Sequence, residues 1–342
     1  PYSYSELSAF CLQISLLLEA AVPLDEGFSI MAEDAADEKE KKMLLYMAEG
    51  AELGDPCFKV LEDTGVFPPY VIRMAKLGQE TGTLDQMMKS LSDYYEKEDR
   101  LIRAVKNAVT YPAMMIVMLL VVLFVLFVKV MPIFSKVYEQ LGAEMSPVAQ
   151  SAIRLGGIFS GAALVLTALI AVMIGAVSIA GKMGIHVNIV QNMIRQIKNR
   201  SKIAQAIAKR RFTSVLSLTL RSGLEFEKGL ELAGELAEND VISEQLKKCS
   251  EKLELGESYY EALKETGMFS GFYIQMIKVG TRSGHLDSVM EEISNDYEEI
   301  TDTAIDNMIA RFEPTIVAVL AVSVGLVLLS VMLPLAGVLS AI

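Results

Sequence analysis

A polar, glycine-punctuated stretch occurs twice in the chain and is the first place to look for chemistry. The first copy, KLGQETGTLDQMM, begins at Lys76, and the second, KVGTRSGHLDSVM, begins at Lys278. Two glycines, a hydroxyl and an acid in one segment would suit a phosphate cradle, a metal loop or a tight turn between helices. The residues concerned are Gly78, Glu80, Gly82, Leu84 and Asp85 in the first copy, and Gly280, Arg282, Gly284, Leu286 and Asp287 in the second.

Phosphate and metal chemistry fit this stretch poorly. A Walker-type loop follows a strand and runs directly into Gly-Lys-Ser/Thr, whereas a helical pattern precedes Gly78 and no such run follows Gly82. A calcium-binding loop needs acids spaced along twelve residues, and the two copies share only Asp85 and Asp287. We therefore expect no cofactor, no metal and no catalytic residue here.

A helix–turn–helix corner explains most of the stretch. Gly78 is expected to end one helix in the left-handed conformation, and Gly82 to allow the sharp turn that follows. The hydroxyl of Thr81 or Thr83 is expected to cap the next helix, in whose first turn Asp85 favours the helix dipole. Glu80 is not required by a turn, so a contact with a partner and an ion pair within the bundle both remain open.

The similarity between the two halves extends along the chain at a constant spacing of 202 residues. Phe10 matches Phe212, Tyr95 matches Tyr297, and Pro112 matches Pro314. A gap-free repeat of this kind indicates tandem duplication. Within each copy the apolar residues recur with a period near 3.6 and no strand-like alternation is present, which predicts compact bundles of five or six short helices.

Three long apolar runs indicate a membrane protein. The chain has a mean hydropathy of +0.37 although 22% of its residues are charged, and a helix of about 20 apolar residues spans a bilayer core. We expect an all-α membrane protein with two homologous cytoplasmic modules and three transmembrane helices. The expected segments are a first module (1–111), a transmembrane helix (112–134), a short external loop (135–155), a second transmembrane helix (156–181), a second module (182–313) and a third transmembrane helix (314–342).

Basic residues predict the orientation of these segments. Residues 182–211 carry eight Lys and Arg and no acid, and basic flanks favour the cytoplasmic side of a membrane. Both modules and the N-terminus are therefore placed inside, and the C-terminus outside. The net charge of −12 argues against a nucleic-acid partner, and the chain opens on Pro1, so we expect native residues before it.

The motifs in combination resemble the type II secretion F family. The pattern Gly-x-Glu-[Ser/Thr]-Gly-x-Leu, a helix and then Tyr-Pro opening a span, duplicated around three spans, is similar to these inner-membrane platform proteins of type II secretion, type IV pilus and competence systems. Tyr111 and Pro112 complete the pattern in the first copy. The second copy departs from it, with Arg282 in the place of Glu80 and Glu313 before Pro314.

The resemblance implies a non-enzymatic platform that couples a hexameric cytoplasmic assembly ATPase to the insertion of pilins or pseudopilins into a fibre. It also implies other inner-membrane assembly proteins as partners, and a homodimer or small homo-oligomer in the bacterial inner membrane. If the acidic residue binds a partner, the first module is the better candidate for that contact. The alternative is a small multi-pass transporter or channel with cytoplasmic regulatory modules, although transporters place ionisable residues near the bilayer midplane and the three runs have none there.

Overall fold

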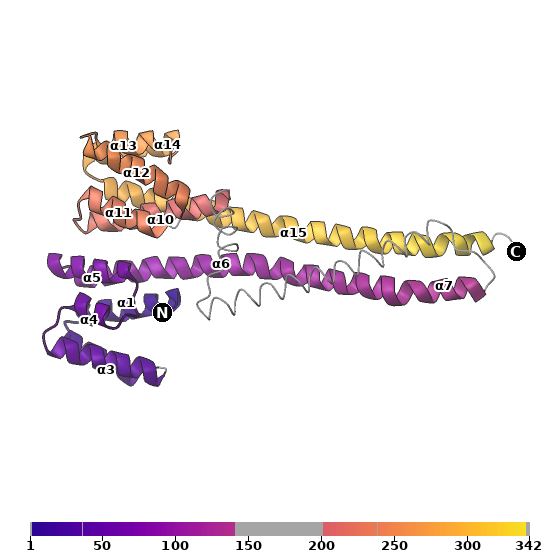
Figure 1. The fold of residues 1–342 in the computed structure, drawn as a ribbon, viewed down its shortest axis with the longest axis horizontal. Helices are drawn as coiled ribbons and strands as arrows, with labels where there is room; N and C mark the ends of the chain where they lie inside the picture. The colour runs from indigo at the N-terminus through magenta and orange to yellow at the C-terminus, as the bar shows by residue number, and fades with distance from the viewer. Residues whose placement is uncertain (1, 36, 141–200, 238, 340–342) are drawn as a thin grey trace. The chain divides into compact units, whose positions relative to one another are not determined.

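The computed structural model describes residues 2–35, 37–140, 201–237 and 239–339, and within these ranges it contains helices and turns but no strand (Figure 1). The chain divides into two compact units. The first comprises Pro1–Ala104 and Arg195–Thr303, and the second comprises Val105–Ile194 and Ala304–Ile342. The expected second transmembrane helix, 156–181, and residues 141–155 of the expected loop lie outside the described residues.

Each half of the first unit is a bundle of short helices followed by one long helix, which confirms the predicted all-helical modules. The first module contains α1 (Tyr4–Glu19), α2 (Leu24–Glu33), α3 (Glu38–Glu52), α4 (Cys57–Asp63), α5 (Pro69–Thr81) and the start of α6 (Leu84–Val125). The second contains α10 (Lys202–Arg221), α11 (Phe226–Ala237), α12 (Asp240–Glu254), α13 (Tyr259–Glu265), α14 (Gly271–Ser283) and the start of α15 (Leu286–Leu339).

The helix bounds reproduce the 202-residue offset. Adding 202 to the bounds of α3, α4 and α5 gives those of α12, α13 and α14, and α2 and α6 begin 202 residues before α11 and α15. The left-handed turn glycines repeat as well, since Gly54 pairs with Gly256 and Gly65 with Gly267. The duplication is therefore a duplication of backbone structure, including its turns.

Local capping explains why several helices begin where they do. The Ser3 hydroxyl accepts from the Glu6 backbone N–H at 3.3 Å, while the Glu6 carboxylate accepts from the Ser3 backbone N–H at 2.6 Å, a reciprocal capping box. Asp37 caps α3 and Asn239 caps α12 through their side chains. These side chains satisfy backbone donors that the first turn leaves unpaired.

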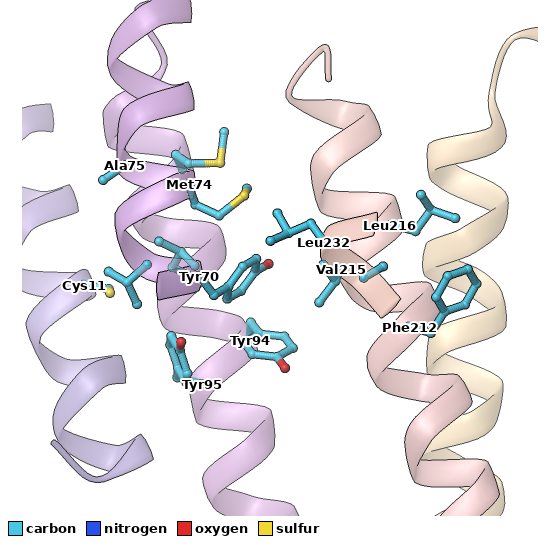
Figure 2. Packing of buried hydrophobic residues seen from close by; sticks show 14 of the residues in the cluster. Cys11, Tyr70, Met74, Ala75, Tyr94, Tyr95, Phe212, Val215, Leu216 and Leu232 are labelled. Carbon is cyan, nitrogen blue, oxygen red and sulfur yellow. The ribbon is translucent and has the colours of Figure 1, made fainter. Parts of the chain in front are cut away.

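Each module is filled by aromatic and aliphatic side chains at equivalent positions. The rings of Phe10 and Phe67 lie 4.6 Å apart in the first module, and their counterparts Phe212 and Phe269 lie 6.3 Å apart in the second. The buried residues of both modules form one continuous apolar cluster, part of which is drawn in Figure 2. The two modules thus fold against one another as a single packed body.

The second unit begins where α6 and α15 leave their modules. α6 passes through Pro112 without a break in the helix. A π-helical turn, η1 (Leu126–Val130), follows and leads into α7 (Met131–Gln140). Pro132 explains the irregular turn, because a proline lacks the N–H that the preceding turn requires and its ring crowds the carbonyl four residues earlier. Residues 135–140, expected in a loop, are therefore helical.

Among the described residues, one helix has the length and apolarity to cross a membrane. It covers Leu84–Val122, and its most apolar window has a mean hydropathy of 1.7 with 11% of its residues buried. The apolar side chains on this helix are widely exposed, as Met114 at 67% and Met118 at 73% illustrate. An apolar and uncovered helix surface of this size suits a lipid environment.

Candidate functional site

The first corner joins α5 to α6 at residues 78–85. Gly82 follows the last residue of α5 with a φ of 71°, a conformation that strains any side chain with a Cβ. The backbone N–H of Thr83 closes the turn by donating to the Gly78 carbonyl at 2.8 Å. The predicted helix–turn–helix corner is confirmed, and Asp85 lies in the first turn of α6 as expected.

Gly78 has a different role from the one expected, because it lies inside α5 and does not end it. A Cβ at Gly78 would lie 2.9 Å from the Cα of Leu84 and 2.9 Å from the Cβ of Met87, closer than nonbonded carbons approach. Gly78 therefore lets α5 and α6 cross in close contact, while Gly82 alone supplies the left-handed turn. The prediction that Gly78 adopts the left-handed conformation is therefore wrong, since Gly82 adopts it.

The second corner, between α14 and α15, repeats this division of roles. Gly284 has a φ of 76°, and a Cβ at Gly280 would lie 2.8 Å from Cγ2 of Val289. Asp287 lies in the first turn of α15, and Leu286 is buried at 8% exposure. Its counterpart Leu84 is partly buried against the core.

The hydroxyls of the corner do not cap the following helix through their side chains. Thr81 donates back to the Leu77 carbonyl at 2.9 Å and contacts the Thr83 hydroxyl at 2.7 Å. Ser283 contacts the Gly280 carbonyl at 3.3 Å. These hydroxyls therefore stabilise the ends of α5 and α14, where unpaired carbonyls need donors.

The charged residue of each corner faces outward. Glu80 and Arg282 are both exposed, and neither forms an ion pair with any residue that the structure describes. Of the two roles left open for Glu80, the ion pair within the bundle finds no support in the described residues. The corners thus present opposite charges to solvent at the same place in an identical turn.

The residues expected where the chain enters the membrane lie well beyond the corners. Tyr111 follows Asp85 by 26 positions (111 − 85) along α6, and Glu313 follows Asp287 by 26 (313 − 287) along α15. Tyr111, Glu313 and Pro314 are exposed, while Pro112 is buried. They belong to the second unit, whereas the corners belong to the first.

A buried ion triplet between the modules was not predicted from the sequence. Glu98 on α6 has 1% of its side chain exposed, and Arg210 and Arg211 on α10 have 3% and 13%. Oε1 of Glu98 accepts from Nη2 of Arg210, and Oε2 accepts from Nε of Arg211 at 2.8 Å. Because the three charges are buried, each depends on the others for the interactions that water would otherwise supply. The triplet therefore links α6 of the first module to α10 of the second.

A buried phenol, a second ion pair and a polar hollow lie close to the triplet. Burial, followed by the Glu98 carboxylate, raises the pKa of Tyr94 well above that of an ordinary phenol. Lys97 adds a second tie between the modules, through Glu298 at 2.9 Å and the Asn295 side chain at 3.1 Å. A polar hollow of about 110 Å³ lies beside these contacts, lined in part by Lys97, Ser217 and Asn295.

A sequence signal for the triplet existed. Glu98 stands in a charged run that is typical of a solvated helix face, yet it falls on the same stripe as Leu91, Tyr94 and Leu101, at the three- and four-residue spacing of a buried helix face. An acid on an apolar stripe indicates a buried charge with a partner. Arg210 and Arg211, counted toward the membrane orientation, are bound by this acid.

The three cysteines are structural. Cys11, Cys57 and Cys249 are unpaired and buried, and burial raises the pKa of each thiol to about 12. Because the thiolate is the reactive form, these residues are inert side chains of the core. No group of acids, cysteines and histidines with metal-binding geometry occurs in the parts of the chain that the structure describes.

Comparison with known proteins bears directly on the repeat. The family described as "Type II secretion system (T2SS), protein F" matches residues 10–132 and again residues 212–334. The two matched segments are offset by 202 residues (212 − 10), the spacing found in the sequence and in the helix bounds. Together they account for most of the chain.

Individual relatives match over nearly the whole chain. A type IV pilus assembly protein PilC from Pseudomonas aeruginosa is 25% identical over 336 residues, which cover 96% of this chain and 88% of that protein. A type II secretion system protein F from Xanthomonas campestris is 28% identical, covering 100% and 85%. A protein transport protein HofC homolog from Escherichia coli is 25% identical, covering 94% and 81%. With both copies of its repeat matched, this chain belongs to the type II secretion system protein F family of membrane-associated assembly platform proteins.

Proposed function

We propose that this chain is the platform that couples a cytoplasmic hexameric assembly ATPase to the insertion of pilins or pseudopilins into a growing fibre. The observation that carries the proposal is the double family match, in which each copy consists of a helical module followed by a long helix that continues into an apolar segment. The modules offer protein surface for the ATPase and for other assembly proteins. The apolar helices offer a surface to pilins, which are held in the same bilayer.

The packing of the modules supports the predicted topology. Residues 1–104 and 195–303 form one compact unit with one apolar cluster, which favours placing both modules in the same compartment. If α6 crosses the membrane at 112–134, the chain has to cross back before residue 195. The proposed span at 156–181 provides that return, and the proposed span at 314–342 then takes the C-terminus outside.

The proposed role is mechanical, with no bond made or broken by this chain. ATP hydrolysis in the partner would move the first unit, and the continuous helices α6 and α15 would carry that movement toward the membrane. A body held together by a buried triplet and a shared core transmits displacement without yielding, because packed interiors have low compressibility. A homodimer or small homo-oligomer would present several such bodies to a hexameric ATPase.

We place the ATPase contact at the first corner, because Glu80 is exposed there without an internal partner among the described residues. An acid on a rigid turn suits a basic patch on the partner, and charges of this kind act mainly on recognition and association rate. The second corner, with Arg282, repels such a patch. The contact is therefore asymmetric between the modules.

The test is co-purification of the full chain in detergent with the assembly ATPase of the same organism. Glu80→Arg should reduce the recovered ATPase at least tenfold and abolish fibre assembly. Glu62→Arg, which changes another exposed acid of the first module, is the matched control and should leave both intact. Normal recovery of the ATPase with Glu80→Arg would show that Glu80 does not contact the ATPase. Failure of the unaltered chain to retain any ATPase would contradict the coupling role itself.

A further inference from the structure

The contact between the modules joins two different faces. The first module contributes its α5–α6 face, and the second contributes its α10–α11 face together with Asn295 and Glu298 on the adjacent part of α15. Arg73 on α5 pairs with Glu235 on α11 at 2.9 Å, and the Ser222 hydroxyl at the end of α10 lies 3.3 Å from Sδ of Met87 on α6. Figure 2 shows Leu232 of α11 pointing toward the helices that carry Tyr70 and Tyr94. The arrangement is head to tail.

Because the chain is a repeat, each of these two faces has an equivalent in the other module. In the described structure both equivalent faces are exposed. The equivalent of α5–α6 in the second module is α14–α15, and the equivalent of α10–α11 in the first is α1–α2. Tyr70 is 2% exposed whereas its equivalent Phe272 is 68% exposed. Leu232 is 6% exposed whereas its equivalent Ile30 is 44% exposed.

Further exposed apolar residues extend the same two faces. Leu16 on α1 is 54% exposed, while its equivalent Leu218 packs against the core. Val279 on α14 is 65% exposed. Each chain therefore carries two complementary faces, α14–α15 and α1–α2, that are equivalent to the two sides of its internal interface but remain uncovered in the described structure.

We infer that these faces join copies of this chain: the α14–α15 face of one copy seats on the α1–α2 face of the next, in the geometry of the internal contact. Such a heterologous interface produces a ring if the rotation closes and an open row if it does not. The inference gives a structural form to the homo-oligomer in the proposed function. It requires nothing of the ATPase contact and fails or holds separately from it.

The polar positions predict how strong this contact is relative to the internal one. The equivalents of Arg73 and Glu235 are Gln275 and Glu33, which can still form a hydrogen bond. The equivalent of buried Glu98 is Ile300, which is 45% exposed, and it would face Ser8 and Ala9 in place of the two arginines. The apolar character of this part of the contact suits an interface that forms and separates without burying charge.

One pair of equivalents opposes association. Lys97 and Glu298 attract one another internally at 2.9 Å, but their equivalents across the proposed contact are Glu299 and Glu96. Two acids at that spacing repel, and salt screens the repulsion over about 10 Å at 0.1 M ionic strength. Association between copies is therefore expected to strengthen as salt is raised from low to moderate concentration.

Thiol crosslinking of the full chain in its native membrane tests the geometry. Glu33→Cys and Gln275→Cys replace two exposed residues, and the native thiols are buried. Co-expressed chains, one carrying each substitution, should give a covalent dimer with a short bifunctional maleimide. Either substitution alone should give none. Efficient self-crosslinking of one variant would indicate a two-fold symmetric contact and overturn the inference, as would the absence of any crosslink in the mixture.

A mixing experiment in detergent distinguishes a head-to-tail contact from nonspecific hydrophobic association. Ile30→Asp and Phe272→Asp each remove one of the two faces, so each variant alone should run as a monomer by size-exclusion chromatography with light scattering. An equimolar mixture retains one intact face of each kind and should form a dimer and nothing larger. Leu53→Asp alters an apolar residue that is 80% exposed on another surface and should assemble as the unaltered chain does. Two monomeric variants that stay monomeric when mixed would contradict the inference, as would undiminished assembly of either variant alone.

Discussion

The two helical modules share one backbone plan but differ in the residues that meet the outside and each other. At the corners, Gly82 and Gly284 keep the same left-handed turn, while Glu80 is replaced by Arg282. At the interface, buried Glu98 is replaced by exposed Ile300. Duplication has thus preserved what the turn requires and changed what each module contacts. The comparison separates positions that serve the fold from positions that serve assembly, and substitutions can test that separation.

The largest loss of stability is expected at the buried triplet. Its acid, Glu98, has no acidic counterpart in the second module. Glu98→Ala leaves Arg210 and Arg211 buried without their carboxylate, and loss of one partner of a buried ion pair destabilises by about 3–5 kcal/mol. The melting temperature of the full chain in detergent should fall by many degrees. Glu96→Ala, at an exposed neighbour, should leave it almost unchanged.

The same position offers a second variant that sharpens the comparison. Replacing all three members by their repeat equivalents, in the variant Glu98→Ile, Arg210→Ser, Arg211→Ala, removes the unpaired charges together with the acid. It should melt above Glu98→Ala although it changes more residues, because it leaves no buried arginine without its carboxylate. A lower melting temperature for the triple variant would mean that the charges themselves hold the modules together.

A smaller and unequal effect is expected at the helix-crossing glycines. Gly78→Ala brings a Cβ against the backbone Cα of Leu84, whereas Gly280→Ala meets mainly the Val289 side chain. A backbone cannot yield as a side chain can, and overpacking costs about 1–3 kcal/mol. Thermal unfolding should therefore show the greater loss for Gly78→Ala. Equal losses would indicate that both corners relax in the same way.

One substitution should improve the first module. Ala21 follows the end of α1 with a φ of 55°, and its equivalent in the second module is Gly223, with a φ of 79°. Left-handed backbone costs a residue with a Cβ about 1–2 kcal/mol, partly offset by the greater freedom of glycine in the unfolded chain. Ala21→Gly should raise the free energy of unfolding by up to about 1 kcal/mol, measured by urea titration in detergent. Gly223→Ala should lower it by a similar amount.

The smallest effect on stability is expected at the exposed corner charges. Arg282→Glu changes a solvated side chain on a rigid turn, and surface substitutions of this kind stay within about 0.5 kcal/mol. The melting temperature should not move. A marked fall would show that Arg282 supports the second module, and that the corner charges cannot be assigned to partner binding alone.

Much of the fold was predictable because it rests on local signals that occur twice. Apolar periodicity predicted the helices, and the constant offset of 202 residues predicted that both modules would share their turns. The role of Gly78 was not predictable from spacing, because two glycines four residues apart both suit a turn. Only the approach of Leu84 and Met87 distinguishes them.

The interface between the modules was harder to predict because it depends on contacts more than 100 residues apart. Glu98 carried a signal in its place on an apolar stripe, but its arginine partners stand in a basic segment that equally suits a membrane flank. The head-to-tail pairing of faces has no signature in either copy alone. It becomes visible only when the exposure of equivalent residues, such as Tyr70 and Phe272, is compared.

The proposed coupling role requires both modules to lie on the same side of the membrane, and site-directed labelling measures this directly. Glu80→Cys and Arg282→Cys each place one exposed thiol on a different module, over a background of buried native cysteines. Glu139→Cys, within the proposed external loop, serves as the positive control. In intact cells a membrane-impermeant maleimide should label only the control, and permeabilised cells should show labelling of all three. Labelling of either module from outside intact cells would contradict the account.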